Sequence, residues 1–338
     1  MQPAFYGRVV YTAFDFELSL GMRERDFDMD RGRSGLQSGL LIIRRVRFDM
    51  KWLSGAFRFC LLVRNVLRDK FDRRFYRPLM LRTDGPLFAL LFNLRACLVY
   101  RSSARIRWSE GAFEVTDQDI PEFCYRIRHA QQCEMAYTRG VLIRSESIHK
   151  AYSLDLIDFQ QGDVFLDCGA NVGDLKIWFE LHSIDVTYIG FEPSPQEYAC
   201  LVSNVAPSVS HNVGLWNDPG DLTFYVSSQG ADSSLIEPPD YDATIMVPTR
   251  RLDSYINGPI KCLKLEAEGA EPEILEGAGD ALRRIEYIAA DLGFERGLTA
   301  ESTLAPVTNY LLARDFELVH VTKSRLCALY RNRAFEGA

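Results

Sequence analysis

The stretch that decides the fold reads Val164-Phe165-Leu166-Asp167-Cys168-Gly169-Ala170-Asn171-Val172-Gly173. An apolar run ends in an acid, and a tight turn of small residues follows it. After the turn, Leu175, Trp178 and Phe179 recur at the spacing of one helix face. This order predicts a buried strand that feeds a helix through a turn where a ligand can approach the backbone.

A second expected strand, residues 187–191, ends in another acid, Glu192, which is followed by Pro193. Glu192 comes about 25 residues after Asp167, which is the spacing of a βαβ unit. Two acids at the tips of adjacent strands suit a nucleoside ligand. The first acid and its turn would approach the polar chain of the ligand, and Glu192 would accept hydrogen bonds from the ribose hydroxyls.

The turn itself indicates which nucleoside is bound. It has no G-x-G, the arrangement that lets a pyrophosphate approach the backbone closely. Asp167, two residues before Gly169, would repel a phosphate and attract a cation. S-adenosylmethionine carries a sulfonium and an ammonium and no phosphate, so the electrostatics favour it over NAD. The alternative is that Asp167 caps a helix and the glycines form an ordinary loop, but Glu192 in register makes this reading less favourable.

The composition limits the number of domains and the classes of protein to which the chain can belong. The 338 residues are 47% hydrophobic, which predicts one large domain with an extension, or two domains. The eight cysteines contain no C-x-x-C and do not pair with the five histidines, so we expect no metal site and a reducing cytoplasm. The first 20 residues lack the apolar core of a signal peptide, and the apolar stretch 86–94 is too short to span a bilayer.

The charge is unevenly distributed. Residues 1–100 carry 18 Lys and Arg against 10 Asp and Glu, whereas the whole chain has a net charge of −7. The basic excess concentrates at residues 44–77, among apolar side chains. We favour a helix with a solvated basic face. The alternative is a peripheral contact with anionic lipid heads, at the inner face of the membrane, or with a charged polymer. No nucleic-acid motif is visible, and we expect no nucleic-acid partner.

Helices alternate with strands along most of the chain, which predicts an α/β fold with a mainly parallel, seven-stranded, Rossmann-like sheet. We place a mainly helical, basic extension at residues 1–102 and the sheet domain at 103–338. Within the extension, helices are expected over 41–100, with breaks near 77–78 and 84–86. The later expected elements are short strands at 104–108 and 111–115, helices at 121–137 (with Phe123, Cys124, Ile127 and Met135 inward), 148–159, 195–204, 252–256, 271–279 and 304–313, strands at 209–215, 222–227, 260–265 and 285–290, and a C-terminal antiparallel hairpin at 316–321 and 325–330.

A third acidic cluster follows the expected strand 260–265, in Glu266-Ala267-Glu268-Gly269-Ala270-Glu271. Ligands bind beyond the carboxyl ends of strands in open α/β sheets, and Glu266 and Glu268 would lie on the same side of an extended backbone. Crowded carboxylates repel, so we expect a raised pKa or a cation partner, and a carboxylate with a raised pKa is a candidate general base. Helix capping is the alternative for Glu271 and Glu273. Asp291 ends the next strand beside the same cleft.

These segments resemble the FkbM-type family of class I S-adenosylmethionine-dependent methyltransferases. The resemblance rests on five motifs in the expected order: residues 165–173, 190–195, 233–235 (Ser-Ser-Leu), 249–253 (Thr-Arg-Arg-Leu-Asp) and 263–278. It covers about residues 105–330 and nothing before residue 100. It implies the parallel sheet with a terminal hairpin, cofactor contacts at Asp167, Gly169, Asn171, Gly173, Glu192, Pro193 and Val213, and catalytic Glu266, Glu268 and Asp291. The family usually has Asp where this chain has Glu266, which leaves open whether Glu266 or Glu268 lies nearer the acceptor.

The resemblance also implies the reaction. Such enzymes mostly methylate hydroxyl oxygens of sugars, polysaccharides and related natural products by in-line displacement. The sequence leaves two other readings open. One is a catalytically inactive cofactor-binding scaffold in a glycan assembly system, which the intact acid clusters disfavour. The other is an NAD-dependent oxidoreductase, which the missing G-x-G disfavours.

Overall fold

The computed structural model describes residues 69–227, 232–322 and 325–336. The chain divides into two units, residues 1–55 and 56–338, and all described residues belong to the second. Of the basic segment 44–77, only residues 69–77 are therefore described. No helix among the described residues is long and apolar enough to cross a membrane.

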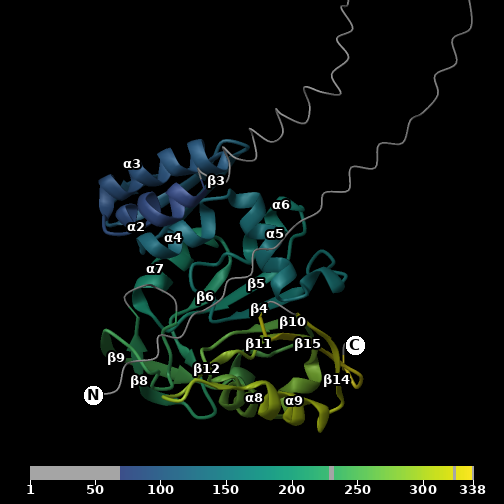
Figure 1. Ribbon diagram of the computed structural model, residues 1–338. Coiled ribbons are helices and arrows are strands. Elements are labelled where there is room, and N and C mark those ends of the chain that lie inside the picture. Colours follow the sequence, from purple (N-terminus) through teal and green to yellow (C-terminus); the bar gives the residue numbers. More distant parts are fainter. Residues whose placement is uncertain (1–68, 228–231, 323–324, 337–338) are drawn as a thin grey trace, which may run out of the picture. The chain divides into compact units, whose positions relative to one another are not determined.

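A seven-stranded sheet forms the centre of this unit (Figure 1). Its spatial order is β14-β15-β11-β10-β4-β5-β6. The strands are β4 (Val164–Cys168), β5 (Thr187–Phe191), β6 (Val209–His211), β10 (Ile260–Leu265), β11 (Ile285–Asp291), β14 (Phe316–Val321) and β15 (Cys327–Asn332). The five strands from β11 to β6 run parallel, and β15 pairs antiparallel with both β11 and β14. The expected mainly parallel sheet with a C-terminal antiparallel hairpin is confirmed.

Both faces of the sheet are buried, which explains the short apolar strand sequences. Phe165 and Cys262 point into one hydrophobic cluster, and Leu166 and Leu263 point into the other. On the first face pack α5 (Val141–Ala151), α6 (Lys176–Leu181) and α7 (Pro195–Asn204). On the second pack α8 (Glu271–Ala278) and α9 (Leu304–Leu312) (Figure 1). The alternation of side chains along each strand thus produces a helix–sheet–helix sandwich.

Smaller elements surround this sandwich. One three-stranded sheet contains β1 (Ala104–Ser109), β2 (Ala112–Asp117) and β3 (Ile120–Ile127), and another contains β7 (Gly214–Leu215), β9 (Ala243–Arg250) and β8 (Gly220–Val226). A third, two-stranded sheet pairs β12 (Phe294–Arg296) with β13 (Glu301–Ser302). Short helical turns complete the unit at η3 (Leu154–Leu156), η4 (Leu252–Tyr255) and η5 (Gly279–Arg284).

The expected helix at 121–137 is wrong in its first half. Phe123, Tyr125 and Ile127 are buried and alternate with more exposed residues, which is the period of strand β3, and the helix α4 begins only at Ala130 (Ala130–Tyr137). Two residues expected inside, Cys124 and Met135, are exposed.

Three further expectations are corrected. The helix expected at 148–159 is α5, which ends at Ala151 because Ser153 takes a left-handed conformation, with φ of 56°. The expected strand 209–215 is divided between β6 and β7, which belong to different sheets. Strand β9 was not expected.

No break occurs at Pro78, since the π-helical turn η1 (Asp72–Tyr76) continues into α2 (Arg77–Met80). The break at 84–86 is confirmed, because α3 (Gly85–Arg95) begins there.

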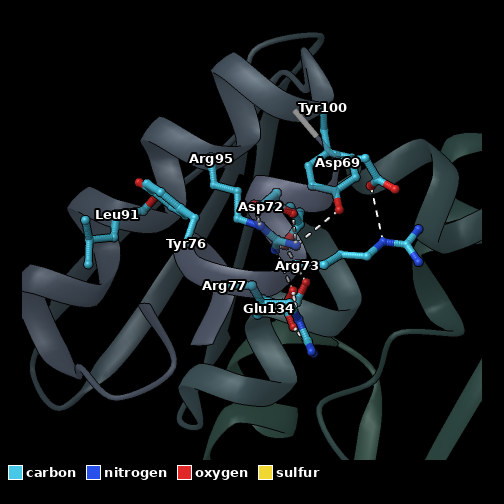
Figure 2. Close-up of polar contacts among 10 residues, drawn as sticks. Asp69, Asp72, Arg73, Tyr76, Arg77, Leu91, Arg95, Tyr100 and Glu134 are labelled. Carbon is cyan, nitrogen blue, oxygen red and sulfur yellow. Dashed lines mark hydrogen bonds and ion pairs between the residues drawn. The ribbon is translucent and has the colours of Figure 1, made fainter. Parts of the chain in front are cut away.

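The helices from residue 69 to η2 (Ala96–Tyr100) share a hydrophobic core with β1–β3 and α4. A buried ionic network ties them together (Figure 2). Arg95 donates to both carboxylate oxygens of Asp72, over 2.7 and 2.9 Å, and also to Glu134 on α4. Arg77 donates two further bonds to Glu134. Burial alone would raise the pKa of Glu134, but the two arginines hold it below its usual value.

We expect Arg95→Met to lower the free energy of unfolding by about 3–5 kcal/mol, because Asp72 would be left as an uncompensated buried charge. The matched control is Arg73→Met, which removes an exposed ion pair with Asp69 on the same helix and should cost at most ~1 kcal/mol. Urea denaturation of both variants measures the difference. Equal losses would contradict the role given to the buried network.

Candidate functional site

The candidate site lies where the parallel strands end. The order of the sheet reverses between β4 and β10, and open α/β sheets bind ligands at such a point. A pocket opens there and is mostly apolar. Its lining residues are Cys168, Gly169, Phe191, Glu192, Pro193, Val213, Gly214, Leu215, Phe224, Ser234, Leu235, Ala267 and Ile274.

The turn after β4 forms one wall of this pocket. The amides of Gly169 and Ala170 both donate to the carbonyl of Phe191 at the end of β5, over 3.0 and 2.9 Å. Gly169 has a φ of +70°, and a Cβ built on it would lie 1.9 Å from the carbonyl oxygen of Glu266. The glycine therefore permits a close approach between the turns that follow β4 and β10.

Two other turn residues have supporting contacts. A Cβ on Gly173 would meet the side chains of Val205 and Leu201, so this glycine allows the turn to pack against α7. Asn171 has a φ of 49°, and its amide donates to Oε2 of Glu192 over 2.9 Å. The Asn171 side chain accepts a hydrogen bond from Gln132 of α4. The turn is thus fixed by a contact with α4 as well as by a contact with Glu192, which follows β5.

Glu192 is a buried acid at the edge of the pocket. Its carboxylate accepts the amides of Asn171 and Ser194, over 2.9 and 2.8 Å. Burial is the main cause that raises the pKa of Glu192 to about 8, and the nearby Glu197 adds to it. A carboxylate accepts more hydrogen bonds than these two. Glu192 can therefore accept hydroxyl donors from a ligand in the pocket.

One buried lysine connects the acidic strand ends. The ammonium of Lys264 lies 3.0 Å from Asp167 Oδ1 and 3.2 Å from Glu266 Oε2, and it donates to the carbonyls of Cys168 and Gly169. Asp167 also accepts the hydroxyl of Tyr188 over 2.6 Å. The Asp167 side chain is only 1% exposed, so its charge is compensated inside the protein rather than at the pocket surface.

Glu266 contacts a second cation from the C-terminal hairpin. Arg325 bonds Glu266 over 2.8 Å and also pairs with the buried Asp291. Burial would raise the pKa of Glu266, but Lys264 and Arg325 lower it to about 2. Glu266 is therefore ionised throughout the neutral range, and Asp291 anchors the arginine that faces it.

Glu268 has a different environment from Glu266. The expected extended arrangement of the two is wrong: β10 ends at Leu265, and Glu268 has a left-handed φ of 49°. Among the described residues, no cation pairs with the Glu268 carboxylate. Burial, and then Glu295, Glu266 and Asp232, raise the pKa of Glu268 well above its usual value. Burial and Asp291 likewise raise the pKa of Glu295 to about 8.

The remaining two glutamates stabilise the loop, and the N-cap residue of α8, Ala270, makes no side-chain capping bond. Glu271 accepts the amides of Ala267 and Gly269 and the hydroxyl of Thr303. Glu273 forms a two-bond pair with Arg296, over 2.8 and 2.7 Å. No group of three His, Cys, Asp or Glu in the described ranges is arranged to hold a metal ion.

Four of the seven residues expected at the cofactor line the pocket: Gly169, Glu192, Pro193 and Val213. Asn171 contacts the pocket through Glu192, whereas Asp167 and Gly173 lie outside the lining. Sequence reasoning missed Lys264, Arg325 and Glu295. Of these, Glu295 lies four residues after Asp291, the acid expected beside the cleft, and Lys264 lies within the motif 263–278.

We expect Gly169→Ala to lower the free energy of unfolding by at least ~3 kcal/mol, because the new methyl group would collide with the Glu266 carbonyl. The matched control is Gly162→Ala. Gly162 also has a positive φ, of +84°, but no atom lies within 4 Å of its built Cβ, so only the conformational cost of ~1–2 kcal/mol is expected. Similar losses in urea denaturation would show that the close approach is not a constraint.

Comparison with known proteins identifies the domain. Residues 167–318 match the family model described as "Methyltransferase FkbM domain". Methyltransferase 1 of Beauveria bassiana (strain ARSEF 2860) is 23% identical over 168 residues, covering 40% of this chain and 68% of that protein. Shikimate dehydrogenase (NADP(+)) of Acidiphilium cryptum (strain JF-5) is 28% identical over 148 residues, covering 43% and 52%. A solved NADB-Rossmann superfamily protein from Streptococcus agalactiae aligns with a TM-score of 0.36 and 14% identity, over 56% of this chain and 68% of that one. The resemblance expected from the motifs is confirmed, because residues 167–318 match the FkbM methyltransferase domain.

Proposed function

We propose that this protein transfers a methyl group from S-adenosylmethionine to a hydroxyl oxygen of a sugar, a polysaccharide or a related natural product. The observation that carries the proposal is the buried Glu192 at the edge of an apolar pocket at the switch point of the sheet. Phe191, Leu215 and Phe224 offer apolar walls to a purine ring, and Glu192 offers acceptors to two ribose hydroxyls.

The same pocket argues against a dinucleotide, although one relative is a dehydrogenase. NADP carries a 2′-phosphate, which an arginine commonly accommodates. The lining contains no lysine or arginine, and the ionised form of Glu192 would repel a phosphate at the ribose. The first two amides of the turn after β4, those of Gly169 and Ala170, already donate to the Phe191 carbonyl, so neither is free to bind a phosphate. These features support a ligand without phosphates.

S-adenosylmethionine supplies an activated methyl group on a cationic sulfur, so the protein has mainly to align the acceptor and take its proton. We assign to Glu268 the role of general base, which accepts the proton of the acceptor hydroxyl. Its raised pKa makes it a stronger base than Glu266. Glu266 and Asp291 are assigned to positioning, since both are bound to Arg325. A sulfonium in the pocket would also favour the ionised form of Glu268.

Titration calorimetry with S-adenosylhomocysteine and with NADP tests the ligand. Binding of the first and not the second is expected, and the reverse result would assign the domain to oxidoreduction. Methyl transfer to a panel of sugars and polysaccharides then separates the enzyme from an inactive scaffold. Mass spectrometry of glycans from cells with and without the protein, seeking a shift of one methyl group, would identify the acceptor.

Nucleoside binding should depend on the ionisation of Glu192. The ionised carboxylate accepts both ribose hydroxyls, and its pKa is about 8, so affinity should rise up to tenfold per pH unit below pH 8 and level off above it. The ligand to use is 5′-methylthioadenosine, because it has the ribose but no titrating amino group. Glu192→Gln should bind more weakly at pH 9 and show no such rise. A wild-type affinity that does not change with pH would remove Glu192 from the ribose.

Glu268→Gln should reduce turnover by about 10²-fold or more with the acceptor found above, because the amide cannot take the proton. Affinity for S-adenosylhomocysteine should stay within about twofold, since Glu268 does not line the pocket. Glu317→Gln, at an exposed position on β14, is the matched control and should leave both unchanged. Normal turnover in Glu268→Gln would exclude this residue as the base.

A further inference from the structure

Seven large apolar side chains are exposed on the helices that precede β1. They are Phe71, Phe75, Leu79, Leu87, Leu90, Leu94 and Leu98, each at least 44% exposed, and we call them the apolar surface. A single exposed leucine is ordinary, but a concentration of this kind on neighbouring helices marks an interaction site.

The spacing of these residues explains why they share faces. Leu87, Leu90, Leu94 and Leu98 follow each other at intervals of three and four along α3 and η2. Phe71, Phe75 and Leu79 follow each other at intervals of four, from the helical residues 69–71 through η1 and α2. The opposite sides of both helices are occupied by the core residues Phe88 and Phe92 and by the buried ionic network. The outward stripes are therefore additional to the residues that the fold itself needs.

The two stripes lie on helices in direct contact. The hydroxyl of Tyr76 donates to the carbonyl of Leu91 over 3.0 Å, and Arg95 pairs with Asp72 (Figure 2). Between Pro86 and Leu98 the only charged residue is Arg95, which is buried. A helix that is apolar on its outer side as well as its inner side requires a partner there.

The charges beside the apolar surface are mainly positive. Lys70, Arg73, Arg74 and Arg82 are exposed, and the Arg74 guanidinium lies 5.8 Å from the ring centre of Phe75. Among the neighbouring acids, Asp69 is paired with Arg73, and Asp84 caps α3. Basic side chains beside exposed leucines and phenylalanines are the composition of helices that lie in the interface of an anionic bilayer.

We propose that the apolar surface binds the face of a lipid bilayer that carries anionic headgroups. Leucine and phenylalanine side chains enter the boundary between headgroups and acyl chains, and the four cations contact lipid phosphates. The positive charge disfavours two other occupants of the apolar surface. One is a second copy of this chain, which would bring the same cations together. The other is the chain's own residues 41–67, which would add more positive charge because they carry six Lys and Arg against one Asp.

The test is sedimentation of the full-length protein with vesicles of phosphatidylcholine, alone or mixed with phosphatidylglycerol. Binding to the mixed vesicles only, and its loss at high salt, are expected. Leu90→Asp should weaken binding at least about tenfold, because it places a charge on the apolar surface. Arg73→Gln with Arg74→Gln should weaken it by a similar factor while the apolar side chains stay in place.

The matched control is Met246→Asp, on strand β9 rather than on the helices of the apolar surface. Met246 is 63% exposed, which is comparable with 57% for Leu90. This variant should bind the mixed vesicles as the wild type does. Absence of vesicle binding, or binding that neither variant weakens, overturns the proposal. A change of oligomeric state in Leu90→Asp without vesicles would assign the apolar surface to a second copy. A large loss of thermal stability in Leu90→Asp, with unchanged vesicle binding, would assign the apolar surface to a contact with the chain's own first residues.

Discussion

The site depends on one buried ammonium group. Lys264 lies between the ends of β4 and β10, where it contacts Asp167, Glu266 and two carbonyl oxygens of the turn. Without this cation, two carboxylates would face each other in a region of low dielectric constant, which is strongly unfavourable. The ammonium also donates hydrogen bonds to the carbonyls of Cys168 and Gly169 in the turn. The close approach of the two turns, which shapes the pocket, thus has an electrostatic as well as a steric basis.

The distribution of cations also divides the roles of the glutamates. Glu266 lies beside Lys264 and Arg325 and stays ionised, whereas Glu268 and Glu295 have carboxylate neighbours and raised pKa values. Groups whose environments move their pKa values apart are typical of sites that transfer protons. Of this pair of nearby acids, Glu266 therefore holds a fixed negative charge, whereas Glu268 has a raised pKa and binds a proton more readily.

The sequence predicted those parts of the fold that local pattern determines. β4, β5 and β10 are short apolar runs because both faces of the sheet are covered. The turn at Gly169 was predicted from the small residues that follow the acid at the end of β4. Long-range contacts were not predictable: Lys264 looked like part of a buried strand, and its partner Asp167 is distant in sequence. The alternation in β3 was misread as a helix because a true helix, α4, follows it closely. The boundary at residue 102 stays a prediction.

The most direct test of the account is a crystal structure of the protein soaked with S-adenosylhomocysteine. We predict density for the adenine among Phe191, Leu215 and Phe224, with the ribose hydroxyls on Glu192 and the sulfur directed toward Glu268. A ligand bound outside this pocket, or a ribose that does not contact Glu192, would contradict the assignment of the methyl-donor site.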